Sequence, residues 1–512
     1  MFRDGSNWGR VACALAGTVS ALALGAAANA QSVAPDSPNK NETGGPLSSS
    51  MPPGASPAKP QPRQGEALPG GQTAPAGLPQ AIRWTEDWSK PVAKDAPLMD
   101  KIRHIPLGGN DDYYLSLGGE ERIYYTDWNH AALGRTKNDS NSPVQSRARL
   151  IADLHLSNLF RAYVELGDNR EWGNSTATKP NQDQLDVYQA FVDVTVPMGK
   201  LGQITVRPGR YEMPLGNGKL MGVREGLNMR FTYQGVRATY ILPGQISVDF
   251  FTVRPVNIKD GAPFDDGPNH QQHYKGVYVS SAKGLAGLGL GTDLYWYRVD
   301  RASATLREGT GVDERDNWGV RFWRRKKGID FDLELNKQTG TFAGKTIDAW
   351  AVLFEGGYTF DNMPLKPRLG ARFNAFSGDG NISDNKAGTF VPASARLPLI
   401  SEAAFFNLSN LVDFYPSVTV RPAKNVSVMV GPDFLWRESR ADGVYIGSTG
   451  ASFAPYGSTH RIGTDLNLEA SYQMTKRLSF RLFETYFDPG QAFKAAGGSH
   501  GNYFGFLTDL RF

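Results

Sequence analysis

The chain contains 512 residues, of which 40% are hydrophobic and 21% charged, and its formal net charge is +4. A chain of this length suggests two or three soluble domains of about 150 residues each. The small net charge argues against nucleic acid as a partner. The single cysteine, Cys13, excludes a structural disulfide, a cysteine-ligated zinc and a catalytic thiol in the rest of the chain. Aromatic residues (11%) and glycine (57 positions) are both plentiful for a soluble protein.

An apolar segment at the N-terminus predicts a secretory signal peptide over residues 1–30. Basic residues precede a small, mostly apolar run at 11–27, and Ala28-Asn29-Ala30 has the small-x-small pattern of a signal-peptidase site. We expect Sec-type export and cleavage after Ala30, which removes Cys13 from the mature chain. A retained transmembrane anchor is the alternative for this segment.

A linker rich in Pro, Ser and Gly is predicted over residues 31–82. Positions 31–80 hold 11 of the 32 prolines of the chain. Such a composition cannot bury a hydrophobic core, so we interpret the segment as a disordered spacer. Residues 83–112 are then a periplasmic lead-in to the domain that follows.

From residue 113 to 512 the sequence consists of runs of about ten residues that alternate apolar and polar side chains. Clusters of Gly, Asn, Asp and Pro separate these runs, and no convincing helical stretch interrupts them, which argues against an α/β enzyme. The runs predict eighteen strands, at 113–125, 144–156, 159–168, 185–196, 202–210, 233–241, 245–254, 271–279, 288–298, 314–325, 328–338, 346–359, 365–376, 412–420, 425–437, 461–472, 477–487 and 502–512.

The connections between these strands alternate between short and long. The long ones are predicted at 126–143, 169–184, 211–232, 255–270, 299–313, 377–411, 438–460 and 488–501, and the pattern is least clear at 280–287 and 339–345. Short periplasmic turns, long extracellular loops and an even strand number are typical of bacterial outer-membrane barrels. The sequence therefore predicts an all-β fold, a transmembrane antiparallel β-barrel of about 18 strands over 113–512, in the outer membrane of a Gram-negative cell.

The last strand supports this prediction. Phe504, Phe506 and Leu510 share one face of the strand, whereas Asp509 lies on the other face, because strand side chains alternate with period 2. The strand ends on an aromatic residue, Phe512, which resembles the C-terminal signal read by the outer-membrane assembly machinery. An ordinary sandwich edge strand is the alternative.

An apolar outer face and a charged inner face are expected for such strands, because lipid offers no partner to a polar side chain. In the strand at 144–156, Leu150 and Leu154 lie on one face, while Arg147 and Arg149 lie on the other. Alternation of this kind assigns the following pore-lining candidates: Arg147, Arg149, Asp153, Asp193, Arg207, Arg237, Arg368, Arg372, Arg461, Asp465 and Arg481. A structural salt-bridge network within the wall is the alternative role for each of them.

Three stretches of the barrel region are similar to a known family. They are Gly209-Arg210-Tyr211-Glu212-Met213 with the downstream segment 216–228; the segments 377–379, 388–390 and 411–416; and Phe434-Leu435-Trp436-Arg437-Glu438-Ser439 with 442–445. Together they resemble the alginate export family of outer-membrane β-barrels over roughly 110–512.

The resemblance implies an 18-stranded monomeric barrel that passes an anionic polysaccharide through an arginine-rich lumen. Arg147 or Arg149, together with Arg207, Arg210 and Arg481, fall on comparable strands and carry this role over. The strand at 185–196 departs from the pattern because it contains no arginine. Expected partners are membrane lipid and lipopolysaccharide, the barrel assembly machinery, an alginate-like polysaccharide or small anionic solute, and periplasmic secretion proteins. No cofactor is expected.

Other chemistry is poorly supported by the sequence. His270 and His273 lack a third metal ligand nearby, and neither Asp265-Asp266-Gly267 nor Asp379-Gly380-Asn381 has the full spacing of a calcium loop, so no metal site is predicted. No nucleophile elbow, phosphate loop or dinucleotide fingerprint is present. We therefore expect a passive polysaccharide channel. A sugar or organic-acid uptake porin of the same fold is the first alternative, and an outer-membrane enzyme the second.

Overall fold

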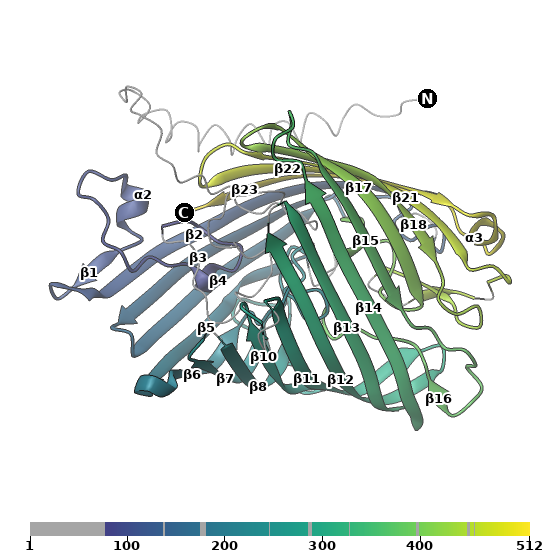
Figure 1. The fold of residues 1–512 in the computed structure, drawn as a ribbon, viewed down its shortest axis with the longest axis horizontal. Helices are drawn as coiled ribbons and strands as arrows, with labels where there is room; N and C mark the ends of the chain where they lie inside the picture. The colour runs from purple at the N-terminus through teal and green to yellow at the C-terminus, as the bar shows by residue number, and fades with distance from the viewer. Residues whose placement is uncertain are drawn as a thin grey trace. The chain divides into compact units, whose positions relative to one another are not determined.

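A computed structural model of the chain describes residues 77–136, 139–174, 181–244, 246–284, 289–326, 328–395, 399–447, 451–454 and 456–512. Eighteen long antiparallel strands form its principal sheet (Figure 1). They are β2 (Asn110–Asn129), β3 (Val144–Leu156), β4 (Phe160–Trp172), β5 (Asp183–Pro197), β6 (Gln203–Tyr211), β7 (Tyr233–Leu242), β8 (Ile246–Asn257), β10 (Gln272–Ser281), β11 (Gly291–Leu306), β12 (Gly309–Lys326), β13 (Ile329–Phe342), β14 (Lys345–Thr359), β15 (Arg368–Phe376), β17 (Leu411–Ala423), β18 (Val426–Trp436), β21 (Arg461–Gln473), β22 (Leu478–Pro489) and β23 (Gly501–Arg511).

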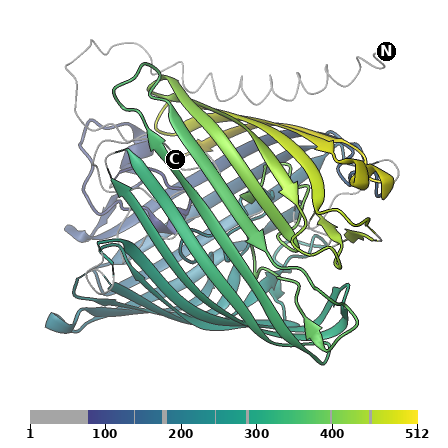
Figure 2. The same ribbon diagram turned by 45° about the vertical axis from the view of Figure 1, so that its right-hand side comes forward.

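These strands close into a barrel (Figure 2). Each pairs with the next long strand along the chain, and β23 pairs with β2 from Glu120↔Arg511 to Asn129↔Asn502. Closure leaves no sheet edge, so the backbone polar groups of the wall are paired within it, as a bilayer requires. The prediction of an 18-stranded antiparallel barrel is confirmed.

The remaining elements are short additions to this wall. The strands β1 (Ile105–Leu107), β9 (Gly267–Pro268) and β16 (Lys386–Ala387) pair with β2, β8 and β14 respectively. A separate two-stranded sheet contains β19 (Val444–Ile446) and β20 (Ala451–Phe453). The helical turns are η2 (Arg83–Thr85), α2 (Leu98–Lys101), η3 (Gly199–Leu201) and α3 (Gln491–Ala495). Among the described residues, no helix has the length and apolar character needed to cross a bilayer.

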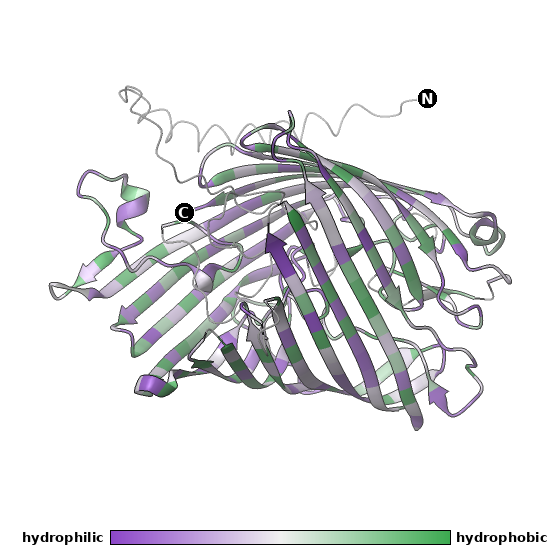
Figure 3. Ribbon diagram, viewed as in Figure 1, coloured by the Kyte–Doolittle hydropathy of each residue, from purple (hydrophilic) through white to green (hydrophobic). Residues whose placement is uncertain are grey.

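Side chains alternate between the two faces of the wall, as Figure 3 shows by the banding of hydropathy along the strands. In β3, Leu150 is 63% exposed on the outer face, whereas its neighbour Arg149 is buried on the inner face. The strand β23 alternates in the same way, with Phe504 and Phe506 outward and Tyr503 and Leu507 buried. Lipid-facing positions are thus apolar, and charged positions are turned to the interior.

The connections differ between the two ends of the barrel. The end at which the chain terminates carries short turns, for example 157–159 and 424–425, whereas the opposite, extracellular end carries long loops such as 212–232 and 377–410. The predicted long loop at 299–313 is wrong. Strands β11 and β12 instead extend beyond their predicted ends and are joined by two residues, 307–308, because cross-strand pairing continues through Thr305↔Thr310. The unclear connection at 339–345 is likewise a two-residue turn.

The N-terminal segment (residues 77–107) packs against the barrel. The last residues of the predicted linker already pack, because Gln80 and Ile82 are buried and the Gln80 amide donates to Glu86 Oε1 at 3.0 Å. Enrichment in proline ends at Pro79, and apolar residues capable of packing follow it. The predicted signal peptide with its Ala30 cleavage site, and most of the linker, lie outside the described residues.

Candidate functional site

Two extracellular-end loops turn into the barrel and meet there. The β6–β7 loop (residues 212–232) and the β15–β17 loop (residues 377–410) start from nearly opposite parts of the wall. Met221 and Ser394 form a β-bridge between them. The Ser394 amide donates to the Leu220 carbonyl at 3.2 Å, and the Gly222 amide donates to the Ser394 carbonyl at 2.9 Å. The two loops therefore form a continuous connection across the interior.

Charged side chains hold the β6–β7 loop to the wall. The Glu225 carboxylate oxygens lie 3.1 Å from a guanidinium nitrogen of Arg147 in β3, 3.5 Å from one of Arg122 in β2 and 3.0 Å from one of Arg230 in the loop itself. Arg147 also donates to the backbone carbonyls of Leu227 (2.8 Å) and Asn228 (2.7 Å). Three guanidinium groups thus converge on one loop carboxylate.

The pKa values of the two acidic groups on this loop shift in opposite directions. Burial raises the pKa of Glu212 to about 7, although Arg230 opposes the shift. Burial acts the same way on Glu225, but Arg230, Arg147 and Arg122 outweigh it and hold the pKa of that carboxyl below its usual range. Glu225 is therefore the permanently charged anchor, and Glu212 is the group that titrates near neutral pH.

The tip of the β6–β7 loop reaches the far wall. Asn217 donates to Asp332 of β13 at 2.9 Å, and Lys219 lies 3.5 Å from Asp332 and 3.6 Å from Glu355 of β14. Gly216 has φ +56, and a Cβ atom there would lie 2.1 Å from the Tyr278 hydroxyl. Only glycine fits this close approach to β10 without moving the loop.

The β15–β17 loop is held mainly by apolar packing. Its side chains enter a buried cluster with residues of β13, β14, β22 and other loops; the loop members are Ala387, Phe390, Leu399, Ile400, Ala403, Phe405, Phe406 and Leu408. Polar contacts to the wall use mostly loop carbonyls, with Arg372 donating to the Ile400 carbonyl at 2.9 Å and Gln338 to the Val391 carbonyl at 2.8 Å.

Most inner-face arginines are paired with carboxylates of adjacent or nearby strands. Arg207 binds Asp193 through two bonds of 2.7 Å, and this parallel geometry is the strong form of the interaction. Other pairs of this kind are Arg161 with Asp153, Arg237 with Asp249, Arg321 with Asp293 and Asp332, Arg368 with Asp330, and Arg372 with Asp413 and Asp433.

The N-terminal segment contacts this inner face near the chain terminus. The Arg207 guanidinium lies between the rings of Trp84 and Phe191, 4.1 and 3.9 Å from their centroids. Arg161 donates to the Trp84 carbonyl at 2.8 Å, and Arg83 donates to the carbonyls of Gly119 (2.7 Å) and Phe512 (2.9 Å). The segment is thereby attached to both β2 and the last residue of the chain.

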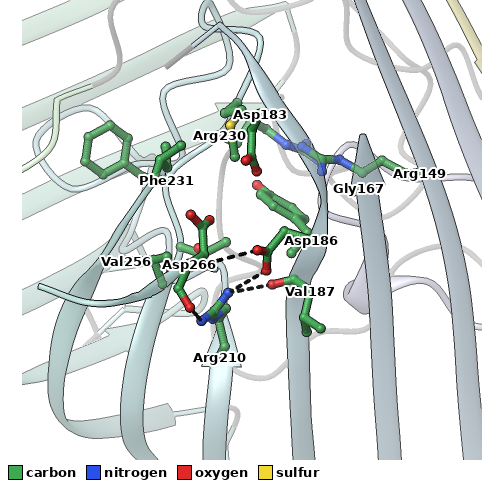
Figure 4. Close-up of a pocket in the computed structure, with 14 residues that line it drawn as sticks. Arg149, Gly167, Asp183, Asp186, Val187, Arg210, Arg230, Phe231, Val256 and Asp266 are labelled. Carbon is green, nitrogen blue, oxygen red and sulfur yellow. Dashed lines mark hydrogen bonds and ion pairs between the residues drawn. The ribbon is translucent and has the colours of Figure 1, made fainter. Parts of the chain in front are cut away.

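A small cavity of about 40 Å³ lies behind the β6–β7 loop, near the extracellular end of β5 (Figure 4). Three arginines and three aspartates line it together with apolar residues; they are Arg149, Arg210, Arg230, Asp183, Asp186 and Asp266. Arg149 stacks on Tyr188 with its guanidinium carbon 3.6 Å from the ring centroid. Its Nε and Nη1 atoms have no hydrogen-bond acceptor within the part of the chain that the structure describes.

The structure places the predicted pore-lining residues in three groups. Buried on the inner face are Arg147, Arg149, Asp153, Asp193, Arg207, Arg237, Arg368, Arg372, Asp465 and Arg481. Arg210 is half-buried and lines the cavity behind the loop.

Arg461 was predicted to face the lumen, but its side chain lies on the outer face of the wall. Its guanidinium lies over Phe434 and Trp436, whose rings flank the buried Leu435 and therefore face outward. A bulge pairs Trp436 with Arg461 and breaks the alternation on which the prediction relied.

Sequence reasoning missed the loop anchors, above all Glu225, Arg230 and Lys219. The region 211–232 was expected to be an external loop. It does lie at the extracellular end of the barrel, but it folds into the interior. A signal was present, because Met213, Leu215, Leu220, Met221 and Val223 are too apolar for a solvated loop, and all five are buried.

The sequence model of the alginate export family matches residues 113–506. The chain belongs to the alginate export family. The matched range covers almost the whole barrel and confirms the resemblance read from the motifs. No curated protein matches the sequence.

Several solved structures share the fold of this protein at low sequence identity. OccAB4 of Acinetobacter baumannii has a TM-score of 0.53 at 8% identity, over 77% of this chain and 97% of that one. OccK2 (OpdF) of Pseudomonas aeruginosa has a TM-score of 0.51 at 9% identity, over 78% and 97%. OccAB1 of A. baumannii has a TM-score of 0.50 at 13% identity, over 78% and 96%. The comparisons thus place the chain in the alginate export family and show a shared barrel fold.

Proposed function

We propose that this protein is a passive outer-membrane channel for an anionic solute, and that a uronate polysaccharide of the alginate class is its solute. The observation that supports the proposal most directly is the convergence of Arg122, Arg147 and Arg230 on the Glu225 carboxylate. A carboxylate on a sugar ring offers the same acceptor atoms to these guanidinium groups as Glu225 does.

Transport requires the β6–β7 loop to move, because it joins the β15–β17 loop across the interior. When the loop carries Glu225 away, the wall arginines Arg122 and Arg147 become available to the carboxylates of a passing polymer. The loop carboxylate then acts as an internal competitor of the solute. Local arginines in this way give anion preference to a chain whose net charge is only +4.

Conductance of the full chain in planar bilayers tests this function. We expect anion-selective channels that oligouronate blocks. Glu225→Gln raises the open probability and strengthens block, because the competitor loses its charge. Arg147→Gln lowers anion selectivity. Cation selectivity of the wild type, or block that neither variant alters, would contradict the proposal.

An uptake porin for small sugars or organic acids is the second candidate. It is favoured by the carboxylates that pair with the inner-face arginines, since a mixed lining suits small polar solutes as well as polyanions. Liposome swelling with neutral sugars separates the two functions. Swelling by sugars without any effect of oligouronate supports the porin.

We also propose that the C-terminal strand is read by the barrel assembly machinery during insertion, and that the mature protein is a monomer. Phe512 exchanges backbone hydrogen bonds with Gly119 at 2.8 and 3.0 Å, so the last residue helps to seal the β2–β23 junction. Deletion of Phe512 should lower the amount of folded protein in outer-membrane fractions. Normal yield would contradict this role.

A further inference from the structure

An acidic cluster lies at the extracellular end of the barrel, outside the loop connection described above. Asp183 is the first residue of β5, and Asp265 and Asp266 lie in the β8–β10 connection just before β9. One carboxylate oxygen from each residue lies within 4.8 Å of the other two. The Phe264 amide donates to the Leu185 carbonyl at 3.1 Å, which holds this connection against β5.

Asp183 is the unusual member of the cluster. It is only 1% exposed, and neither of its carboxylate oxygens has a hydrogen-bond donor among the described residues. Figure 4 shows its carboxylate directed into the cavity that Asp266 also lines. Burying a carboxylate without a partner is costly, so its orientation indicates a missing positive group.

Within the described part of the chain, the neighbouring basic groups are engaged elsewhere. Arg210 lies 3.4 Å from Asp186 and donates to the carbonyls of Val187 (2.7 Å) and Asp266 (3.0 Å). The Lys259 ammonium donates to the Asp265 carbonyl at 2.5 Å.

The other two arginines of the cavity also have carboxylate partners outside the cluster. Arg149 has Glu165 as its nearest carboxylate, at 3.8 Å, and Arg230 is bound to Glu212 and Glu225. The three cluster carboxylates are therefore left with net negative charge.

We propose that Asp183, Asp265 and Asp266 bind a divalent cation of the calcium type. Calcium takes oxygen ligands at about 2.3–2.6 Å, so oxygens on opposite sides of the ion lie about 5 Å apart, which suits the spacing of this cluster. The smaller Mg²⁺ requires ligands at about 2.0–2.1 Å and near-octahedral order, and it retains water more strongly. A bound ion joins the β8–β10 connection to the start of β5.

Isothermal titration of the full chain, folded in detergent and stripped with EDTA, tests the site with CaCl₂. We expect one saturable site, at least tenfold weaker in Asp183→Asn, with MgCl₂ a poor competitor. Asp260→Asn is the matched control, because Asp260 is exposed in the same connection but does not belong to the cluster. Its affinity should equal that of the wild type.

Asp265→Asn provides a second variant in a more exposed position, in case Asp183→Asn does not fold. Heat-dependent mobility in gels reports folding of each variant, and calcium should raise the melting temperature of the wild type but not of Asp265→Asn. Absence of saturable calcium binding by the wild type overturns the proposal. Equal affinity in a folded Asp183→Asn or Asp265→Asn variant overturns it too. Neither outcome bears on the channel function.

Discussion

The β6–β7 loop and the β15–β17 loop meet at the Met221–Ser394 bridge, but different forces bring each of them there. The first is held by the ion pairs of Glu225 and Lys219 and by arginines bound to its carbonyls, in addition to the burial of its own apolar side chains such as Leu220. The second is held by side chains such as Phe405 and Leu399 in a buried apolar cluster.

This difference matters for gating. A buried ion pair gains much Coulomb energy but loses hydration, so its net contribution is small and changes with the protonation and pairing of either partner. Apolar burial has no comparable dependence on charge and grows with the area removed from water. We therefore expect the β6–β7 loop, whose docking depends on charge as well as on apolar burial, to be the movable half of the connection, and the β15–β17 loop to be the fixed half.

Loss of Arg147 should have the largest effect on the movable half. Arg147→Ala removes the bonds to Glu225, Leu227 and Asn228 and leaves a buried carboxylate with fewer partners. Breaking a buried pair on one side costs about 3–5 kcal/mol. We expect the open probability in planar bilayers to rise by at least tenfold.

Arg170→Ala is the matched control for this change, because Arg170 pairs with Asp168 in a half-exposed position on the strand next to β3. Its gating should equal that of the wild type. A closed Arg147→Ala channel in a folded barrel would show that charge does not hold the β6–β7 loop.

Leu399→Ala tests the fixed half. Leu399 is buried in the apolar cluster, and truncation of such a side chain costs about 2–5 kcal/mol through lost burial and a residual cavity. The melting temperature should fall, while the dependence of gating on pH stays as in the wild type. Met363→Ala, at an exposed turn of the opposite end, should change neither quantity. A changed pH dependence in Leu399→Ala would contradict the division into two halves.

The wall of the barrel was predictable because alternation of side chains is a local property. The alternating positions of Leu150 and Arg149 predict which of them faces lipid and which faces the interior. The alternating last strand, which ends at Phe512, predicts a final strand of the barrel. The interior was not predictable, because nothing local to Glu225 indicates that Arg122 and Arg147, which lie 103 and 78 residues away along the chain, will reach it. Parity also failed at Arg461, where one bulge reversed the facing of a side chain.

The pH dependence of gating sharpens the comparison, because the β6–β7 loop carries a group, Glu212, that titrates near neutrality. Burial raises the pKa of Glu212 from about 4.5 to about 7. Because its pKa is higher in the docked loop, Glu212 contributes its full stabilisation of docking below about pH 4.5. This stabilisation is lost as the pH rises through 7. Glu225 has a lowered pKa, so it stabilises docking at pH values above its ordinary pKa of about 4.5, and this stabilisation is lost in acid.

Docking should therefore be strongest near pH 4.5 and should weaken as the pH rises towards 7, so channel opening should increase several-fold from pH 5 to pH 7. Single-channel recordings across this range measure the effect. Glu212→Gln should remove this increase, and Glu314→Gln, at a more exposed carboxylate of β12, should retain it. An increase that persists in Glu212→Gln assigns the titration to another group.

The smallest effect is expected at the N-terminal segment, which shares features of both loops because Trp84 packs an apolar ring on the charged Arg207. A cation–π contact of this kind contributes about 0.5–2 kcal/mol, so Trp84→Ala should release the segment about two- to thirtyfold more often. Maleimide labelling of Ile82→Cys, a buried position, reports each release. Leu98→Ala, exposed on α2, should leave the labelling rate unchanged. The hydrogen bonds that the Arg83 and Arg161 side chains donate to backbone carbonyls persist in Trp84→Ala, so the stability of the barrel should not change. If Trp84→Ala does not alter the labelling rate of Ile82→Cys, these hydrogen bonds alone retain the segment.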